Sequence, residues 1–390
     1  MDLLPEDVLA DHDNCWSAFL LRRPSPSAAV VSADLDYTFP GATDDEIYSH
    51  EAFVARDHCN GLLLVDDRVV NPATRQWARL PPRPPPSIVG PTGHYYFYSD
   101  VYLAYDPAVS PHYEVFAVPR VRRKQGLYNG DQMMSEKESP FLYSELDPAV
   151  EELQWPPSPC VLHVFSSRTG RWEKRSFVRR GAAAARTVAD MRIDQFIWHR
   201  HAVYWGGALY VHCQTDFIMR LSLSSQEYQL IQPPVPFKPD SRSRSVESYA
   251  RRLSIGKSEK GVYSVLVEQS QIKVWMLDET NGQFMWVSKQ LDYHLPKLQD
   301  RSFLLSQLES HGPWVLQAIS SHYYTGPDAG FQTAEPDQFE WDSDNNNILP
   351  ENGNTTGYKK FITFIGFHPF KEVIFLNDSL DGKSASLSFE

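Results

Sequence analysis

Short apolar runs alternate with turn residues along most of this chain, which is typical of short β-strands. Residues 57–82 show the pattern best, reading D-H-C-N-G-L-L-L-V-D-D-R-V-V-N-P-A-T-R-Q-W-A-R-L-P-P. The apolar run 61–65 lies between turn residues, as expected of a buried strand. The polar triplet 66–68 then forms a turn, after which Val69 and Val70 begin a second strand.

A third strand follows in the same stretch. Pro72 has no N–H to donate and Asn71 can bond its own backbone, so the two residues end the second strand. The third strand resumes after Thr74, with Trp77 and Leu80 as apolar anchors. Three short antiparallel strands in this order make most of one propeller blade.

The sequence repeats this strand, turn, strand and tryptophan theme about every 45 residues, which indicates sheets arranged radially. Each blade alone would expose an apolar face, so closure into a ring buries the core. The pattern predicts an all-β fold, a kelch-like β-propeller of six or seven blades with a short N-terminal helical remnant. Further strands and blades are predicted at 94–118, 161–172, 202–234, 261–287, 314–319, 361–367, 373–376 and 385–389.

The predicted organisation has three parts. Residues 1–23 form a short helical segment, residues 24–56 a linker with a candidate closing strand, and residues 57–390 the propeller. Loop insertions are predicted near 120–159, 236–252 and 321–358, where periodicity is lost and polar or charged residues dominate.

Composition narrows the class of protein. Aromatic residues make up 13% of the 390 residues and there are 29 prolines, which favours strands and turns. A formal charge of −12 argues against a nucleic-acid-binding protein. The four cysteines form no C-x-x-C pair and the N-terminus is acidic, so we expect a reduced protein of the cytoplasm or nucleus. No stretch has the apolar length needed to cross a bilayer.

The string C-N-G-L-L-L, N-P-A-T-R-Q-W and L-P, in this order and with these gaps, resembles the opening signature of the F-box-associated propeller domain of plant F-box proteins. The resemblance covers this one blade closely and the later blades only in pattern. The residues that carry it are Asn60, Gly61, Leu62, Asn71, Pro72, Trp77, Leu80 and Pro81.

The N-terminal run L-P-E-D-V-L-A is similar to the first line of an F-box. Pro5 suits the first helical position, and the acids that follow it favour a helix N-terminus. Residues 11–14 interrupt the pattern where a family member continues with further helices, so this F-box is truncated. The resemblance implies that the following residues contact a Skp-type adaptor: Leu4, Pro5, Val8 and Leu9.

The resemblance implies a function in protein recognition. In the family the F-box binds the adaptor of an SCF-type (cullin-RING) ubiquitin ligase, and the propeller holds the protein to be ubiquitinated. We therefore expect a non-catalytic substrate-recognition subunit with no cofactor or metal, whose substrate protein is unknown. Two alternatives stay open: a free-standing propeller that binds a partner without a ligase, and a sugar-binding or enzymatic propeller.

Motifs that suggest catalysis fail on spacing. Neighbours in the strand Asp57-His58-Cys59 point to opposite faces, so they cannot form a relay. The two imidazoles of His199-Arg200-His201 share a face but lack a nearby acidic or thiol ligand. Gly256-Lys257-Ser258 and Gly382-Lys383-Ser384 lack the earlier glycine of a phosphate loop, and His50-Glu51 lacks the second histidine of a zinc protease.

The aromatic runs 95–98 and 323–324 have a simpler interpretation. Such residues pack blades together by default, and any exposed members would be anchors on a binding face.

Overall fold

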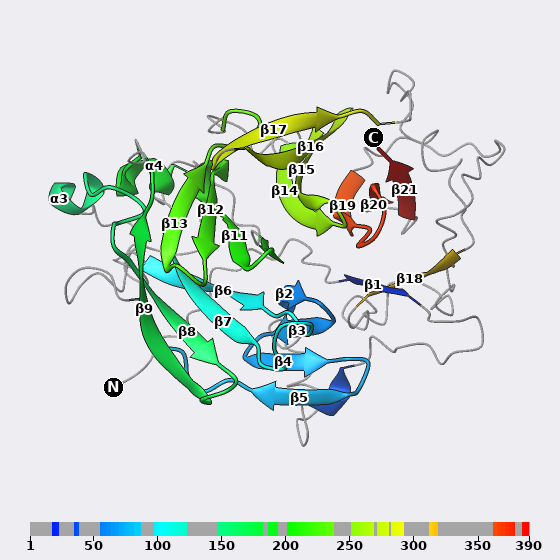
Figure 1. Cartoon of the computed structure of the whole chain (residues 1–390), viewed down its shortest axis with the longest axis horizontal. Coiled ribbons are helices and arrows are strands. Elements are labelled where there is room, and N and C mark those ends of the chain that lie inside the picture. The colour runs from blue at the N-terminus through cyan, green and yellow to red at the C-terminus, as the bar shows by residue number, and fades with distance from the viewer. Residues whose placement is uncertain are drawn as a thin grey trace, which may run out of the picture.

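The computed structural model describes residues 18–22, 35–38, 55–86, 97–122, 147–181, 186–193, 201–237, 251–268, 271–280, 282–291, 312–318, 362–378 and 384–389. Within these residues the protein is mostly β, and its sheets stand around a common axis as the blades of a propeller (Figure 1). The predicted all-β, propeller-type fold class is confirmed. The segment boundaries predicted for the chain stay predictions.

Blade 1 is the stretch with which the sequence pattern began. Its four strands pair antiparallel in chain order: β2 (Ala55–Cys59), β3 (Leu62–Val65), β4 (Arg68–Asn71) and β5 (Gln76–Arg79). The turn between β2 and β3 is built by Asn60 and Gly61, whose φ angles of 46° and 87° favour asparagine and glycine. All four residues of β3 are buried, as the apolar run predicts.

Blade 2 contains the segments that the sequence pattern had assigned to two blades. Its strands are β6 (Phe97–Ala104), β7 (Glu114–Val121), β8 (Cys160–Ser166) and β9 (Arg171–Arg179). The prediction of separate blades at 94–118 and 161–172 was wrong, because β7 pairs antiparallel with β8 across the insertion that separates them in sequence.

Blade 3 agrees with the prediction for 202–234. It contains β10 (Ala202–Trp205), β11 (Ala208–His212), β12 (Ile218–Ser222) and β13 (Glu227–Ile231). A short parallel pairing of β13 with β9 joins blades 2 and 3 into one eight-stranded sheet.

Blade 4 contains β14 (Arg251–Ser258), β15 (Gly261–Glu268), β16 (Gln271–Thr280) and β17 (Gln283–Lys289). Blade 5 has three described strands, β19 (Ile362–Phe367), β20 (Val373–Asp378) and β21 (Ser384–Ser388), close to the predicted positions. A bridge between Leu291 and Phe389 ties the end of blade 4 to blade 5.

The strand β1 (Ala18–Arg22) corrects one expectation for the N-terminal segment. Residues 18–22 were assigned to a helical remnant, but they pair antiparallel with β18 (Gly312–Ala318). Pairing with a distant partner can override a local preference in so short a segment. The rest of the predicted helical segment lies outside the described residues, and a blade count of six or seven stays a prediction.

Helices are short within the described residues. They are η1 (Asp36–Thr38), α3 (Pro148–Glu151), α4 (Val188–Arg192) and η3 (Gln214–Asp216). α4 begins with a capping box in which Thr187 and Asp190 exchange hydrogen bonds, and it buries Met191 in the core of blades 2 and 3.

The core lies between the blades. Leu64 and Val69 of blade 1 share a buried cluster with Leu103 and Val115 of blade 2, to which Phe165 also belongs. A similar cluster joins blades 3 and 4. Because inner strands are covered on both faces, they read as continuous apolar runs and not as clean alternation.

Aromatic residues on the fourth strands brace neighbouring blades. The indole Nε1 of Trp172 donates to the carbonyl of Pro81 (2.9 Å), and that of Trp286 donates to the carbonyl of Gln232 (2.8 Å). Trp77 occupies the position in β5 that Trp172 has in β9, but it is 36% exposed, so the expectation that it is an apolar anchor was wrong. Leu80 is buried as predicted.

Candidate functional site

The first strands of the blades end together on one face of the propeller. Lys257, near the end of β14, donates from Nζ to the Asn60 side chain in blade 1 (2.7 Å) and to the carbonyl of Tyr204 in blade 3 (3.1 Å). The Asn60 amide in turn donates to the carbonyl of Tyr105 in blade 2 (2.6 Å). We call this face, formed by the β2–β3, β6–β7, β10–β11 and β14–β15 turns, the turn face.

The triplet Asp57-His58-Cys59 lies on β2 beside this meeting point. Asp57 and Cys59 are buried and His58 is exposed, so the alternation of an extended strand separates them as predicted. The Asp57 carboxylate accepts a hydrogen bond from the backbone N–H of Leu103 (2.7 Å), and the Cys59 thiol donates to the carbonyl of Tyr105 (3.3 Å). Both side chains therefore join blade 1 to blade 2.

Burial dominates the pKa values of Asp57 and Cys59. It raises the pKa of Asp57 to about 8, although the N–H of Leu103 and the charge of Lys257 favour the ionised form. Burial also raises the pKa of the Cys59 thiol to about 11, which leaves it protonated and a poor nucleophile at neutral pH. Asp57, Cys59 and Lys257 therefore hold neighbouring blades together.

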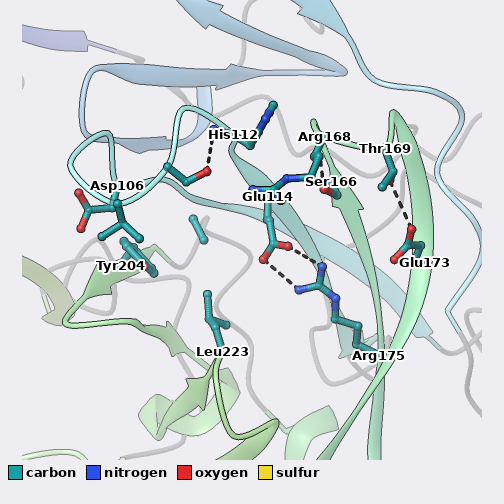
Figure 2. Close-up of a pocket in the computed structure, with 13 residues that line it drawn as sticks. Asp106, His112, Glu114, Ser166, Arg168, Thr169, Glu173, Arg175, Tyr204 and Leu223 are labelled. Atoms are coloured by element: carbon teal, nitrogen blue, oxygen red, sulfur yellow. Dashed lines mark hydrogen bonds and ion pairs between the residues drawn. The ribbon is translucent and has the colours of Figure 1, made fainter.

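A pocket opens on the turn face, at the seam between blades 2 and 3 (Figure 2). Its volume is about 400 Å³. The β6–β7 loop and the β8–β9 turn form one side, and Tyr204 and Leu223 of blade 3 form the other. The pocket is therefore built from two blades that share one sheet.

Local hydrogen bonds fix the β6–β7 loop at the rim of the pocket. The carbonyl of Asp106 accepts from the N–H groups of Val109 (3.0 Å) and Ser110 (2.9 Å), and its carboxylate accepts from the N–H of Ala108 (3.0 Å). Tyr113 and Ser167 exchange two hydrogen bonds that tie this loop to the β8–β9 turn. Val109 stands at the rim with 78% of its surface exposed.

An ion pair lies in the lining of the pocket. The Arg175 guanidinium contacts both carboxylate oxygens of Glu114, with 2.9 Å between Nη1 and Oε2, as the dashed lines in Figure 2 show. The hydrogen bonds to Glu114 raise the pKa of Arg175 above its ordinary value. Both side chains keep about a quarter of their surface exposed, so the pair can meet a bound group.

The pocket offers polar contacts from its carboxylate, guanidinium and hydroxyl side chains. Within the described residues there is no group of three or more His, Cys, Asp or Glu side chains placed to hold a metal ion. Of the predicted histidine pair, His201 is described and His199 lies outside the described residues. The arrangement suits recognition of a polar surface group.

The strand β14 contains the Gly256-Lys257-Ser258 triplet, so these residues form no phosphate loop. A Cβ atom at Gly256 would lie 2.3 Å from the ring of Phe367 in blade 5. The Ser258 hydroxyl lies 2.8 Å from both the His368 and Lys371 carbonyls, and can donate to either. The triplet is a joint between blades 4 and 5.

All eight signature residues lie in the described part of blade 1 and the segment that follows it. Asn71 Oδ1 accepts from the N–H groups of Ala73 (3.1 Å) and Thr74 (3.2 Å), which makes the predicted turn. Pro72 follows in that turn and Leu62 is buried in β3. The predicted adaptor residues and the other motifs lie wholly or largely outside the described residues: Leu4, Pro5, Val8, Leu9, His50-Glu51, Gly382-Lys383 and Tyr323-Tyr324.

The sequence pattern missed the residues that build the pocket. Glu114 and Arg175 are 61 positions apart, and no local spacing joins them. In the aromatic run 95–98, Phe97 is buried and Tyr98 is 37% exposed, with the Arg122 guanidinium 5.6 Å from its ring centre. Of this run, Phe97 therefore packs in the core and Tyr98 lies at the surface.

No family model matches the chain, and no curated protein matches it. Among the helices that the structure describes, none has the length and apolar character needed to cross a bilayer.

Proposed function

We propose that this protein is a non-catalytic recognition propeller that docks a partner protein on its turn face, as the substrate-recognition subunit of an SCF-type ubiquitin ligase does. The observation that carries the proposal is the pocket between blades 2 and 3, with the partly exposed Glu114–Arg175 pair in its lining. Polar groups held in place by a rigid scaffold are what a recognition site requires.

The resemblance to plant F-box proteins supports the ligase part of the proposal. The signature residues lie in blade 1, where Asn60 reaches blades 2 and 4 and Pro81 accepts the Trp172 brace. In this proposal, Leu4, Pro5, Val8 and Leu9 contact a Skp-type adaptor, and other ligase subunits transfer ubiquitin. The protein then acts in the cytoplasm or nucleus.

Pull-down of the full-length chain with a purified Skp-type adaptor tests the ligase part. We expect capture by the full chain and loss of capture when residues 1–23 are deleted. The deletion also removes the strand β1, so a triple variant, Leu4→Ala with Val8→Ala and Leu9→Ala, is tested beside it. This variant keeps β1 and should also lose capture. Absence of capture, or capture that survives the deletion, contradicts the ligase proposal.

A second candidate is a free-standing propeller that binds its partner without a ligase. The observation that favours it is β1, because residues 18–22 form a strand paired with β18 and not an F-box helix. In that case the partner still binds the turn face, and variants of the pocket reduce its capture while deletion of residues 1–12 does not.

A further inference from the structure

We propose that the pocket accepts a cationic side chain, arginine or lysine, from a basic segment of the partner protein. The inference deepens the proposed function and rests on it as far as the partner is a protein. It is carried by three features of the pocket: its uncompensated carboxylates, its apolar and aromatic wall, and the position of the Glu114–Arg175 pair.

The carboxylates in the pocket exceed the cations that could neutralise them. Three carboxylates line it, those of Asp106, Glu114 and Glu173, against the guanidinium groups of Arg168 and Arg175. Arg175 is engaged at both nitrogens by Glu114. Within the described residues, the carboxylate of Asp106 accepts one hydrogen bond, from the backbone N–H of Ala108, and that of Glu173 accepts one, from the Thr169 hydroxyl (3.3 Å). A cation from outside would compensate this excess.

The wall from blade 3 suits the stem of a long basic side chain. Tyr204 and Leu223 present ring and aliphatic surface across the pocket from Glu114 (Figure 2). Arginine and lysine bury their methylene stems on such surface while the charged head stays with polar groups. A tyrosine ring can also attract the cation through its face.

The electrostatic surroundings of Tyr204 agree with this choice. Burial raises the pKa of the Tyr204 hydroxyl first, and the charges of Asp106 and Glu114 raise it further. The negative charges of Asp106 and Glu114 thus act at Tyr204, in the pocket wall from blade 3, where they favour a cationic group. An anionic guest would meet the same carboxylates and would find Arg175 already paired, with Arg168 as the other guanidinium of the pocket lining.

The charge of the whole chain acts in the same direction. A formal charge of −12 at pH 7 attracts basic partners and repels acidic ones over distances limited by salt. Rim charges of this kind affect association rates and their salt dependence more than final affinity. A basic segment is therefore attracted to the protein before it enters the pocket.

Fluorescence anisotropy with the full-length protein tests the proposal. The probes are three labelled glycine-serine peptides of equal length that carry two arginines, two lysines or two glutamates. The test variant combines Asp106→Asn with Glu173→Gln, which removes two charges and keeps the Asp106 oxygen that caps Ala108. The matched control is Glu259→Gln, an exposed acid in the β14–β15 turn on the same face.

We expect both basic peptides to bind more tightly than the glutamate peptide, with affinity falling as salt is added. The double variant should weaken basic-peptide binding by about tenfold and Glu259→Gln by less than about twofold. Equal binding of all peptides, tighter binding of the glutamate peptide, or no effect of the double variant overturns the proposal. If no peptide binds while the adaptor is still captured, this inference fails and the proposed function stands.

Discussion

Asp57 shows how one buried side chain can link the blades and make their stability depend on pH. Its carboxyl group accepts from Leu103 across the joint of blades 1 and 2 and is only 4% exposed. Burial raises its pKa from 3.8 to about 8. The folded protein therefore keeps a proton there at neutral pH that the unfolded chain has released.

This difference predicts that stability falls as pH rises from about 4 to about 8. The folded state binds more protons than the unfolded state in that window, and the loss reaches at most about 1.4 kcal/mol per pH unit. Urea unfolding at several pH values measures the slope. Asp57→Asn, which keeps an oxygen for the Leu103 N–H, should give a flatter profile.

The control for this prediction is Glu259→Gln, which changes an exposed carboxyl and should keep the wild-type slope. A wild-type slope in Asp57→Asn would show that Asp57 is not the titrating group. The slope decides the question, because the amide can also lower stability at every pH.

At the scale of elements, the contacts between blades decide stability. Blades 4 and 5 approach so closely at Gly256 that a Cβ atom there would clash with the Phe367 ring. Gly256→Ala should lower the free energy of unfolding by about 1–3 kcal/mol, because the ring has to shift. Denaturant unfolding measures the change.

The chain provides its own control for the glycine prediction. A Cβ atom at Gly366 meets nothing within 4 Å, so Gly366→Ala should change stability by less than about 1 kcal/mol. Adding Phe367→Leu to Gly256→Ala makes room and should recover part of the loss. Equal effects at Gly256 and Gly366 would contradict the close approach of the two blades.

The aromatic braces give a second prediction at this scale. Trp172→Phe removes the hydrogen bond to the Pro81 carbonyl and should cost about 0.5–1.5 kcal/mol. Trp77→Phe, at the equivalent and exposed position of blade 1, should cost less than about 0.5 kcal/mol. Thermal or denaturant unfolding compares the two, and equal costs would show that the brace is not what stabilises the joint.

The same elements show what the sequence could and could not predict. The turns at Asn60-Gly61 and Asn71-Pro72 follow from backbone preferences of these residues, so blade 1 was predictable almost strand by strand. The assignment of strands to blades was not predictable, because β7 and β8 are separated by an insertion and pair through long-range contacts. The exposure of Trp77 depends on the neighbouring unit, which local pattern does not reveal.

The candidate site was less predictable than the fold for the same reason. Glu114 reads as one polar position in an alternating strand, and nothing near it in sequence points to Arg175. Lys257 reads as part of a failed phosphate loop, although in the folded protein it reaches two other blades. Contacts between blades depend on tertiary geometry, so their residues are found only once the blades are placed.

At the scale of the whole molecule, the pairing of β9 with β13 makes blades 2 and 3 a single sheet. The pocket lies at the seam of these two blades, and its two sides share backbone hydrogen bonds between Val178 and Gln226 and between Arg180 and Tyr228. An incoming segment then meets sides that are already in place. The protein therefore loses little conformational entropy when a partner binds. Changes in the bound side chain should then alter mainly the dissociation rate of the complex.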